Sequence, residues 1–189
     1  MRIERASESH LAVLAELAAR TFRDAFGPEN TPADMEKYLE RAFSTAQLRL
    51  ELADRASVFL LAWQGRGVRP AGYAKLRDGN PDPSVSGPKP IELERLYVDR
   101  EAVGRGRGSQ LMSACLEHAG AAGFETLWLG VWEHNPRAIA FYRRWHFAEV
   151  GDHVFLLGKD EQRDVIMERP VSMEPGADLP SDGPRRRPR

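Results

Sequence analysis

The sequence predicts an α/β domain built on a mixed β-sheet. Segments rich in β-branched and aromatic residues alternate along the chain with segments whose apolar residues recur every three or four positions, the spacing of an amphipathic helix. One strand segment, Thr126–Val131, is almost entirely apolar, as expected of a strand that is covered on both faces. These two observations favour a sheet with helices packed against it over an all-helical or all-β fold.

Capping residues mark the helices expected in the N-terminal part of the chain. Ser7 precedes the first helix, and Thr31 caps the second with Pro32 at its first helical position. Ser44 begins the third helix in a capping-box pattern with Gln47. The elements expected here are a strand at residues 1–5 and helices at about 8–25, 32–43 and 44–53.

The remainder of the chain predicts most of the sheet. Between two of its strands, Asp78–Pro90 contains four prolines and two glycines, which predicts a mobile loop. The elements expected here are strands at about 57–63, 70–77, 91–98 and 126–131, helices at 106–122 and 135–145, and a closing hairpin of strands at 153–157 and 163–168.

Composition excludes several classes of protein. The 189 residues include 27 basic and 28 acidic side chains, a net charge of −1, which shows no global footprint for nucleic acid. No apolar run approaches the roughly 20 residues of a membrane span, and the charged N-terminus is unlike a secretion signal, so we expect a cytoplasmic protein with no membrane partner. The single cysteine, Cys115, excludes an internal disulfide framework and a thiolate metal cluster. The five histidines show no ligand spacing, so no metal is expected.

The chain is short enough for a single core, which predicts one domain over residues 1–169. From residue 170 the sequence becomes rich in proline and arginine and poor in large apolar side chains. Such a segment cannot offset its ordering entropy by burial, so residues 170–189 are predicted to be a disordered tail.

A glycine-rich segment, Val103-Gly104-Arg105-Gly106-Arg107-Gly108-Ser109, lies directly between a predicted strand and a predicted helix. It departs from the dinucleotide-binding pattern because Ser109 stands where the last glycine is needed, and no Gly-Lys-Ser/Thr follows as in a Walker loop. What remains is a turn whose backbone N–H groups can approach a pyrophosphate at the positive end of a helix. The alternative is a flexible surface connection with two solvated arginines.

Two motifs carry a resemblance to a known family. The glycine segment resembles the acyl-coenzyme A loop of the GNAT family of N-acetyltransferases, Gln/Arg-x-x-Gly-x-Gly/Ala, with Val103 at the Gln/Arg position. The segment from Asn135 to Phe147 resembles the Asn-x-x-Ala-x-x-Phe-Tyr-x-x-x-Gly-Phe helix of that family, with His146 in place of the glycine. The resemblance covers about residues 91–147. It implies a mixed, mostly antiparallel central sheet flanked by helices on both faces, with acetyl-CoA as cosubstrate.

A closer resemblance extends to almost the whole chain up to Glu168. Phrases such as WLGVWEHNPRAIAFY and VGDHVFLLGKDEQRDVIM are similar to the bacterial PaiA-type spermidine/spermine N-acetyltransferase branch. This similarity implies a small-molecule amine as acceptor, with a polyamine as the first choice. Shared ancestry is a weaker guide to substrate than to chemistry.

The resemblance also implies roles for individual residues. Tyr142 is expected to protonate the departing thiolate, because a phenol with a pKa near 10 is protonated at neutral pH. Glu94, as first choice, and Glu92 compete as the general base that deprotonates the amine; a regular strand would direct both to one face, and a bulge would separate them. The residues expected to bind acetyl-CoA are Leu96, Tyr97, Val98, Val103, Gly104, Arg105, Gly106, Arg107, Gly108, Ser109, Asn135, Ala138 and Tyr142.

Two alternatives stand beside a polyamine acetyltransferase that works by direct attack. One is a protein N-acetyltransferase that modifies a lysine or an N-terminal amine. The other is a non-catalytic acetyl-CoA-binding regulator, in which Val103 and His146 would mark drift from an active ancestor. Cys115 falls on the inward-facing stripe of its predicted helix, which argues against an acyl-cysteine intermediate. The family resemblance also implies a homodimer.

Overall fold

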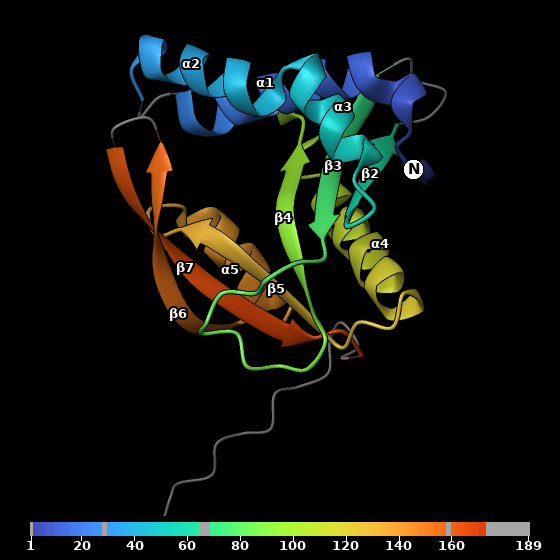
Figure 1. Ribbon diagram of the computed structural model, residues 1–189, viewed down its shortest axis with the longest axis vertical. Coiled ribbons are helices and arrows are strands. Elements are labelled where there is room, and N and C mark those ends of the chain that lie inside the picture. The colour runs from blue at the N-terminus through green and yellow to red at the C-terminus, as the bar shows by residue number, and fades with distance from the viewer. Residues whose placement is uncertain (1, 28–29, 65–68, 158–159, 173–189) are drawn as a thin grey trace, which may run out of the picture.

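The computed structural model describes residues 2–27, 30–64, 69–157 and 160–172 as a seven-stranded sheet with helices on both faces (Figure 1). The strand order is β1-β2-β3-β4-β5-β7-β6, and every neighbouring pair is antiparallel except β4 with β5. This confirms the predicted mixed, mostly antiparallel sheet. The strands are β1 Arg2–Arg5, β2 Ser57–Trp63, β3 Pro70–Arg77, β4 Pro90–Val98, β5 Thr126–Trp132, β6 Ala148–Leu157 and β7 Asp160–Pro170.

Two hydrophobic clusters hold the helices on opposite faces of the sheet. The first three helices share a cluster rich in aromatic residues with β2, β3 and β4, whereas the last two pack against the other face. In Figure 1 the first group forms the layer at the top, above the ends of β2 to β4. The helices are α1 Leu11–Phe26, α2 Pro32–Phe43, α3 Thr45–Ala53, α4 Arg107–Ala121 and α5 Pro136–Arg144.

The caps expected at Thr31 and Ser44 are formed, but the capping box expected of Ser44 and Gln47 is not, because the Gln47 side chain donates to Glu51 at 3.0 Å. The Thr31 side chain accepts from the Asp34 N–H, and the Ser44 hydroxyl accepts from the Gln47 N–H at 3.2 Å. After the C-terminal end of α5, His146 adopts a positive φ of 63°. This is the left-handed conformation that favours glycine after a helix. The chain therefore leaves α5 as a glycine-containing motif would, at a cost in backbone strain.

Two features of the sheet create an opening at its centre. The parallel pair β4–β5 extends only from Pro90↔Thr126 to Glu92↔Trp128, after which the two strands diverge (Figure 1). On its other edge β4 pairs with β3, and a register shift there leaves Glu94 as an extra residue, a β-bulge. The edge of β4 that faces β5 is thus unpaired beyond Glu92 within the described residues, and its backbone polar groups can serve a ligand.

The structure differs from the elements predicted from sequence in three places. The closing hairpin is longer than expected, because pairing of β6 with β7 begins at Ala148↔Glu168 instead of near His153. The first helix begins with a 3-10 turn at Glu8–His10. The proline-rich loop, expected to be mobile, is tied to the sheet by hydrogen bonds from Ser86 and Gly87 to the Glu168 carboxylate. Most of the expected tail, residues 173–189, lies outside the described residues.

Candidate active site

A cavity of about 710 Å³ lies where β4 and β5 diverge. Its lining divides into two parts of different chemistry. The glycine half comprises the open edge of β4, the glycine loop and α5: Leu96, Val98, Val103, Gly104, Gly106, Gly108, Ser109, Asn135, Arg137, Ala138, Phe141, Tyr142 and Arg144. The carboxylate half comprises charged and aromatic side chains: Phe22, Phe26, Tyr38, Phe43, Glu92, Glu94, Arg95, Trp132, His153 and Asp164.

Backbone conformation shapes the glycine half. Gly104 and Gly106 have φ angles of +80° and +72°, a left-handed region that side chains rarely adopt. A Cβ at either position would meet no atom within 4 Å, so it would project into open space where a ligand can approach the chain. Gly106 caps α4 without any side-chain hydrogen bond, which leaves the first N–H groups of this helix available to an anion. This geometry fits a pyrophosphate.

Four arginines lie around the glycine half. The sequence motifs predicted that Arg105 and Arg107 contact the ligand, but neither side chain lines the cavity. Arg137 and Arg144 of α5 line it instead, and the motifs did not predict them. Arg107 donates to Gln110 Oε1 at 3.0 Å, and its buried Nε has no hydrogen-bond partner among the described residues. The positive charge that the sequence predicted for this end of the site is present, but α5 supplies the part that faces the cavity.

Asn135 and Tyr142 project from α5 into the cavity. Asn135 Oδ1 accepts from the Ala138 N–H at 3.0 Å, so this side chain caps the helix while it lines the site. Tyr142 packs edge-on against Phe141 and Phe147, and its hydroxyl makes no hydrogen bond to a described residue. Burial, with a smaller effect of Cys115, raises the pKa of Tyr142 well above 10. The phenol is therefore protonated at neutral pH and free to donate a proton into the cavity.

Cys115 lies behind Tyr142 in the core, on α4. Its side chain is fully buried and does not line the cavity. Burial raises the pKa of this thiol to about 12, so almost none of it is thiolate at neutral pH. The structure therefore agrees with the expectation that Cys115 is a packing residue.

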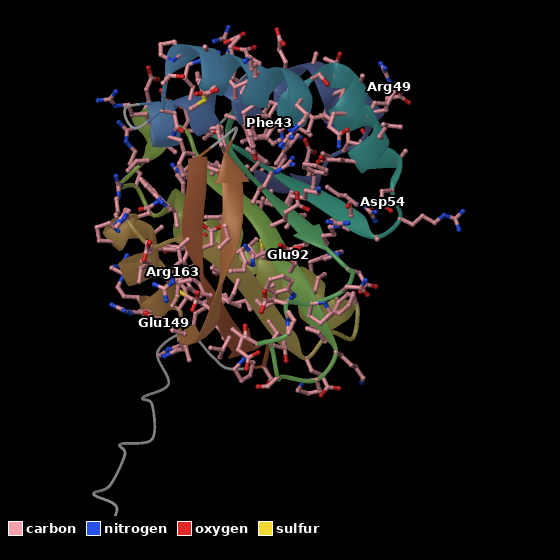
Figure 2. The ribbon with its side chains drawn as sticks, turned by 60° about the vertical axis from the view of Figure 1, so that its left-hand side comes forward. Phe43, Arg49, Asp54, Glu92, Glu149 and Arg163 are labelled. Carbon is pink, nitrogen blue, oxygen red and sulfur yellow. The ribbon has the colours of Figure 1, made fainter. Side chains whose placement is uncertain are left out.

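The two candidate bases have different surroundings. Glu92 is the last residue of β4 that pairs with β5. It lines the cavity and makes no hydrogen bond or ion pair to a described residue. Burial, and then the negative charge of Glu94, raises the pKa of Glu92 above its ordinary value. Figure 2 shows the labelled Glu92 at mid-height of the sheet, with Phe43 on the helical layer above it. A partly buried, unpaired carboxylate with a raised pKa is suited to accept a proton.

Glu94 is held in a buried network of ion pairs at the bulge. Lys75 Nζ lies 2.8 Å from Glu94 Oε1 and 3.0 Å from Glu51 Oε2, and its side chain is only 4% exposed. Arg95 binds both oxygens of Glu51, at 2.8 and 3.1 Å, and lies 3.2 Å from Glu94. These two cations neutralise Glu94 and Glu51, which links α3 to β3 and β4. The contacts of Glu94 are those of a structural ion pair.

Several residues of the carboxylate half were missed by sequence reasoning. His153 on β6 and Asp164 on β7 are cross-strand partners that both line the cavity. Aromatic side chains from α1, α2 and β5 complete this wall, with the Phe26 and Trp132 rings 6.1 Å apart. No motif spacing joins residues so far apart in the chain. The only available signal was the alternation of the hairpin strands, which places His153 and Asp164 on one face once the register is known.

The described residues were also compared with the requirements of a metal site and of a membrane span. Within the described part of the chain, no group of three or more histidine, cysteine, aspartate or glutamate side chains is arranged to hold a metal ion. Among the helices of that part, none is long and apolar enough to cross a membrane.

Comparison with known proteins relates this site to an enzyme family. The sequence model described as Acetyltransferase (GNAT) family matches residues 13–147. An uncharacterized N-acetyltransferase of Lactobacillus delbrueckii subsp. lactis is 34% identical over 169 residues, which cover 89% of this chain and 96% of that protein. An uncharacterized N-acetyltransferase of Mycobacterium tuberculosis is 32% identical over 157 residues, or 82% of this chain and 94% of that protein.

Solved structures show the same fold. PaiA N-acetyltransferase from Thermoplasma acidophilum, solved in complex with coenzyme A, has a TM-score of 0.69 at 21% identity, covering 90% of this chain and 99% of that one. The ribosomal-protein-S18-alanine N-acetyltransferase from Escherichia coli has a TM-score of 0.65 at 18% identity, covering 94% and 97%. Of these two names, only the second states an acceptor, a ribosomal protein, so the likeness establishes the fold and leaves the acceptor open.

Proposed function

The chain belongs to the GNAT family and is an acetyl-CoA-dependent N-acetyltransferase, and from this premise we propose that it acetylates a primary amine of a polyamine such as spermidine by direct attack. One observation carries the proposal: a single cavity joins Tyr142, on the glycine half, to the unpaired Glu92 on the carboxylate half. An acid and a base on opposite sides of one space are what acetyl transfer to an ammonium requires.

The walls of the carboxylate half support a cationic acceptor. Glu92 and Asp164 bring negative charge to this part of the cavity, and the cation Arg95 is already paired with Glu51. The aromatic rings of Phe26 and Trp132 line this part of the cavity, and aromatic faces attract an ammonium group. The resemblance to PaiA-type enzymes points to the same class of substrate. A neutral or anionic amine would gain nothing from these carboxylates.

The glycine half is suited to hold acetyl-CoA. The N–H groups at the start of α4 and the chain at Gly104 and Gly106 would bind the pyrophosphate, with Arg137 and Arg144 nearby. The unpaired edge of β4 at Leu96 and Val98 would bind the pantetheine arm, and a backbone N–H there would stabilise the oxyanion that develops. The cosubstrate supplies the activated acetyl group.

Two side chains would then move protons. Glu92 would take a proton from the acceptor ammonium, which must become neutral before its nitrogen can attack. Tyr142 would donate its phenolic proton to the departing sulfur. We assign the base to Glu92 in preference to Glu94, because Lys75 and Arg95 already occupy the Glu94 carboxylate.

Thiol release from acetyl-CoA tests the proposal. The wild-type protein and Tyr142→Phe are compared on spermidine, spermine, short diamines, aminoglycosides and lysine peptides. We expect turnover on the polyamines, and a fall in kcat of about 10²-fold in the variant with little change in KM for acetyl-CoA. Turnover on lysine peptides alone would show that the acceptor is a protein. Acetyl-CoA binding without turnover on the whole panel would contradict the enzymatic proposal and favour a regulator.

The expected homodimer and the cytoplasmic location stay predictions. Light scattering after size-exclusion chromatography measures the oligomeric state directly.

A further inference from the structure

A histidine flanked by two carboxylates lies at the carboxylate half, and the chemistry above does not use it. His153 Nδ1 is 3.2 Å from Asp82 Oδ2, and His153 Nε2 is 4.0 Å from Asp164 Oδ2. His153 and Asp164 line the cavity, whereas Asp82 does not and touches the site only through His153. The three residues come from the proline-rich loop, β6 and β7.

Hydrogen bonds from Ser84 hold the Asp82 side chain in place independently of His153. Asp82 Oδ1 accepts from the Ser84 N–H at 2.9 Å and from the Ser84 hydroxyl at 2.6 Å. Burial alone would raise the pKa of Asp82, but these hydrogen bonds and His153 hold it below its ordinary value. Asp82 is therefore an ionised carboxylate, which can only accept hydrogen bonds.

The sheet leaves room for this arrangement. A Cβ on Gly130 of β5 would lie 3.4 Å from Asp164 Oδ2 and 3.7 Å from His153 Cε1, so both side chains are in van der Waals range of this position on β5. Ser84 packs against Gly151 of β6, where a Cβ would collide with it. Gly151 therefore lets the loop bring Ser84, and with it Asp82, close to β6 and His153.

The partners of His153 determine which ring nitrogen carries the proton. Because Asp82 accepts only, Nδ1 must be the N–H donor, and in the neutral ring the lone pair then lies on Nε2. Nε2 lies on the side of Asp164. Glu92 is also close enough that a positive charge on His153 lowers its pKa, which partly offsets the rise caused by burial. A proton on Glu92 thus has a basic nitrogen within electrostatic reach.

The stoichiometry of acetyl transfer requires an outlet for one proton. When R–NH3⁺ becomes an amide, its nitrogen loses two protons. The proton lost after attack restores the phenol of Tyr142, which has protonated the sulfur, whereas the proton taken by Glu92 before attack must leave to solvent. We propose that His153, oriented by Asp82, is a positioning residue that relays the proton taken by Glu92. Through a water in the cavity, its Nε2 accepts the proton that Glu92 has taken from the acceptor ammonium. The ring, 39% exposed, then releases the proton to solvent, and the Glu92 carboxylate is restored. The relay rests on the proposed role of Glu92.

Steady-state kinetics with acetyl-CoA and spermidine, or the best amine of the panel above, test the relay. We expect His153→Ala to lower kcat by about 10²-fold with KM for both substrates nearly unchanged, and added imidazole to restore part of the rate. Asp82→Asn keeps an oxygen for Ser84 but allows the other ring tautomer, so it should cause a smaller loss of the same kind. Asp152→Asn is the matched control, because Asp152 precedes His153 but pairs with Arg163, 3.1 Å away, and should retain wild-type kinetics.

Nitrogen NMR of the imidazole gives a readout that does not depend on turnover. We expect His153 to be the Nδ1–H tautomer in the wild-type protein and a mixture of tautomers in Asp82→Asn. An Nε2–H tautomer in the wild type, or no change in the variant, would overturn the proposal. So would an increase in KM for the amine at unchanged kcat, which would make His153 a binding residue.

The failure of the relay and of the proposed base are distinguishable. If Glu92→Gln loses activity while His153→Ala does not, the base stands and the relay is wrong. If neither variant loses activity, the assignment of Glu92 itself is wrong.

Discussion

The two halves of the cavity are built from different parts of the chain. The glycine half uses two short continuous stretches, from Leu96 to Ser109 and from Asn135 to Arg144, and its glycines, Gly104, Gly106 and Gly108, present backbone alone. The carboxylate half is formed by side chains that come from six different elements: α1, α2, β4, β5, β6 and β7. A site that binds its ligand through backbone groups depends on the local conformation of the chain, which residues close in sequence determine. A site that binds its ligand through charge depends on side chains that only the fold brings together.

The same contrast separates the two glutamates of β4. Glu92 and Glu94 differ by two positions, yet Glu92 lines the cavity without an ion pair to a described residue, whereas Glu94 pairs with Lys75 and Arg95. A cavity-lining carboxylate is thus available for chemistry only where no cation is packed against it. The variants below test this comparison between the halves.

The largest effect is expected from removing the charge of Glu92. Glu92→Gln should lower kcat/KM for the amine by about 10²-fold or more, because the base is lost while the shape is kept. Glu94→Gln, the matched variant, should lose less than about tenfold. Thiol release with saturating acetyl-CoA measures both. Equal losses in the two variants would contradict the assignment of the base.

The pH profile of the same variants checks the assignment separately. Glu92 must be ionised to accept a proton, so the rate should fall as the pH is lowered through its raised pKa. Since the charge of Glu94 contributes to that rise, Glu94→Gln should move this acidic limb to lower pH. A limb that moves to higher pH would show that another group titrates there.

The next effect is on stability. Lys75→Met removes a buried cation from two carboxylates, and we expect a loss of about 3–5 kcal/mol in the free energy of unfolding. Lys89→Met is the control, because Lys89 pairs with Glu125 at the surface and should have no measurable effect. Chemical denaturation measures both variants. A small loss for Lys75→Met would show that the network does not hold α3 to the sheet.

Two glycine variants, for which we expect a smaller loss of stability, separate the effect of backbone strain from the effect of ligand binding in the glycine half. Gly106→Ala and Gly123→Ala both place a side chain at a positive φ, +72° and +84°, with no atom nearby. Each should lose about 1–2 kcal/mol of stability. Only Gly106→Ala should also weaken coenzyme A binding, by about tenfold in calorimetry. Equal affinity in the two variants would place the pyrophosphate elsewhere.

The smallest expected effect is an increase in stability. His146→Gly should relieve the strained φ of 63° after α5 and raise stability by about 1 kcal/mol, with kcat unchanged. His146→Ala keeps a Cβ in the same conformation and should give no such gain. Thermal melts compare the two. A loss of activity in His146→Gly would show that this departure from the motif matters for chemistry.

Much of the fold could be predicted from the sequence, because it depends on local patterns. The caps at Thr31, Ser44 and Asn135, the apolar β5 and the glycines at Gly104 and Gly106 all act within a few residues. The hairpin of β6 and β7 was underestimated, since its first part carries no clear strand signal and forms through pairing with distant residues. The proline-rich loop was misjudged for the same reason: the Glu168 carboxylate that holds it lies about 80 residues away in the chain.

By itself, then, the sequence determined the glycine turns and the helix caps of the glycine half, because backbone conformation is a local property. It did not determine which arginines face the cavity, and Tyr142 was expected from the family resemblance. Only the tertiary structure decided the carboxylate half. The contacts of Lys75 and Arg95 distinguished Glu94 from Glu92, and pairing of β5, β7 and β6 brought His153 and Asp164 to the cavity. Charge acts through space, so which carboxylate is free and which is neutralised depends on neighbours that are distant in sequence.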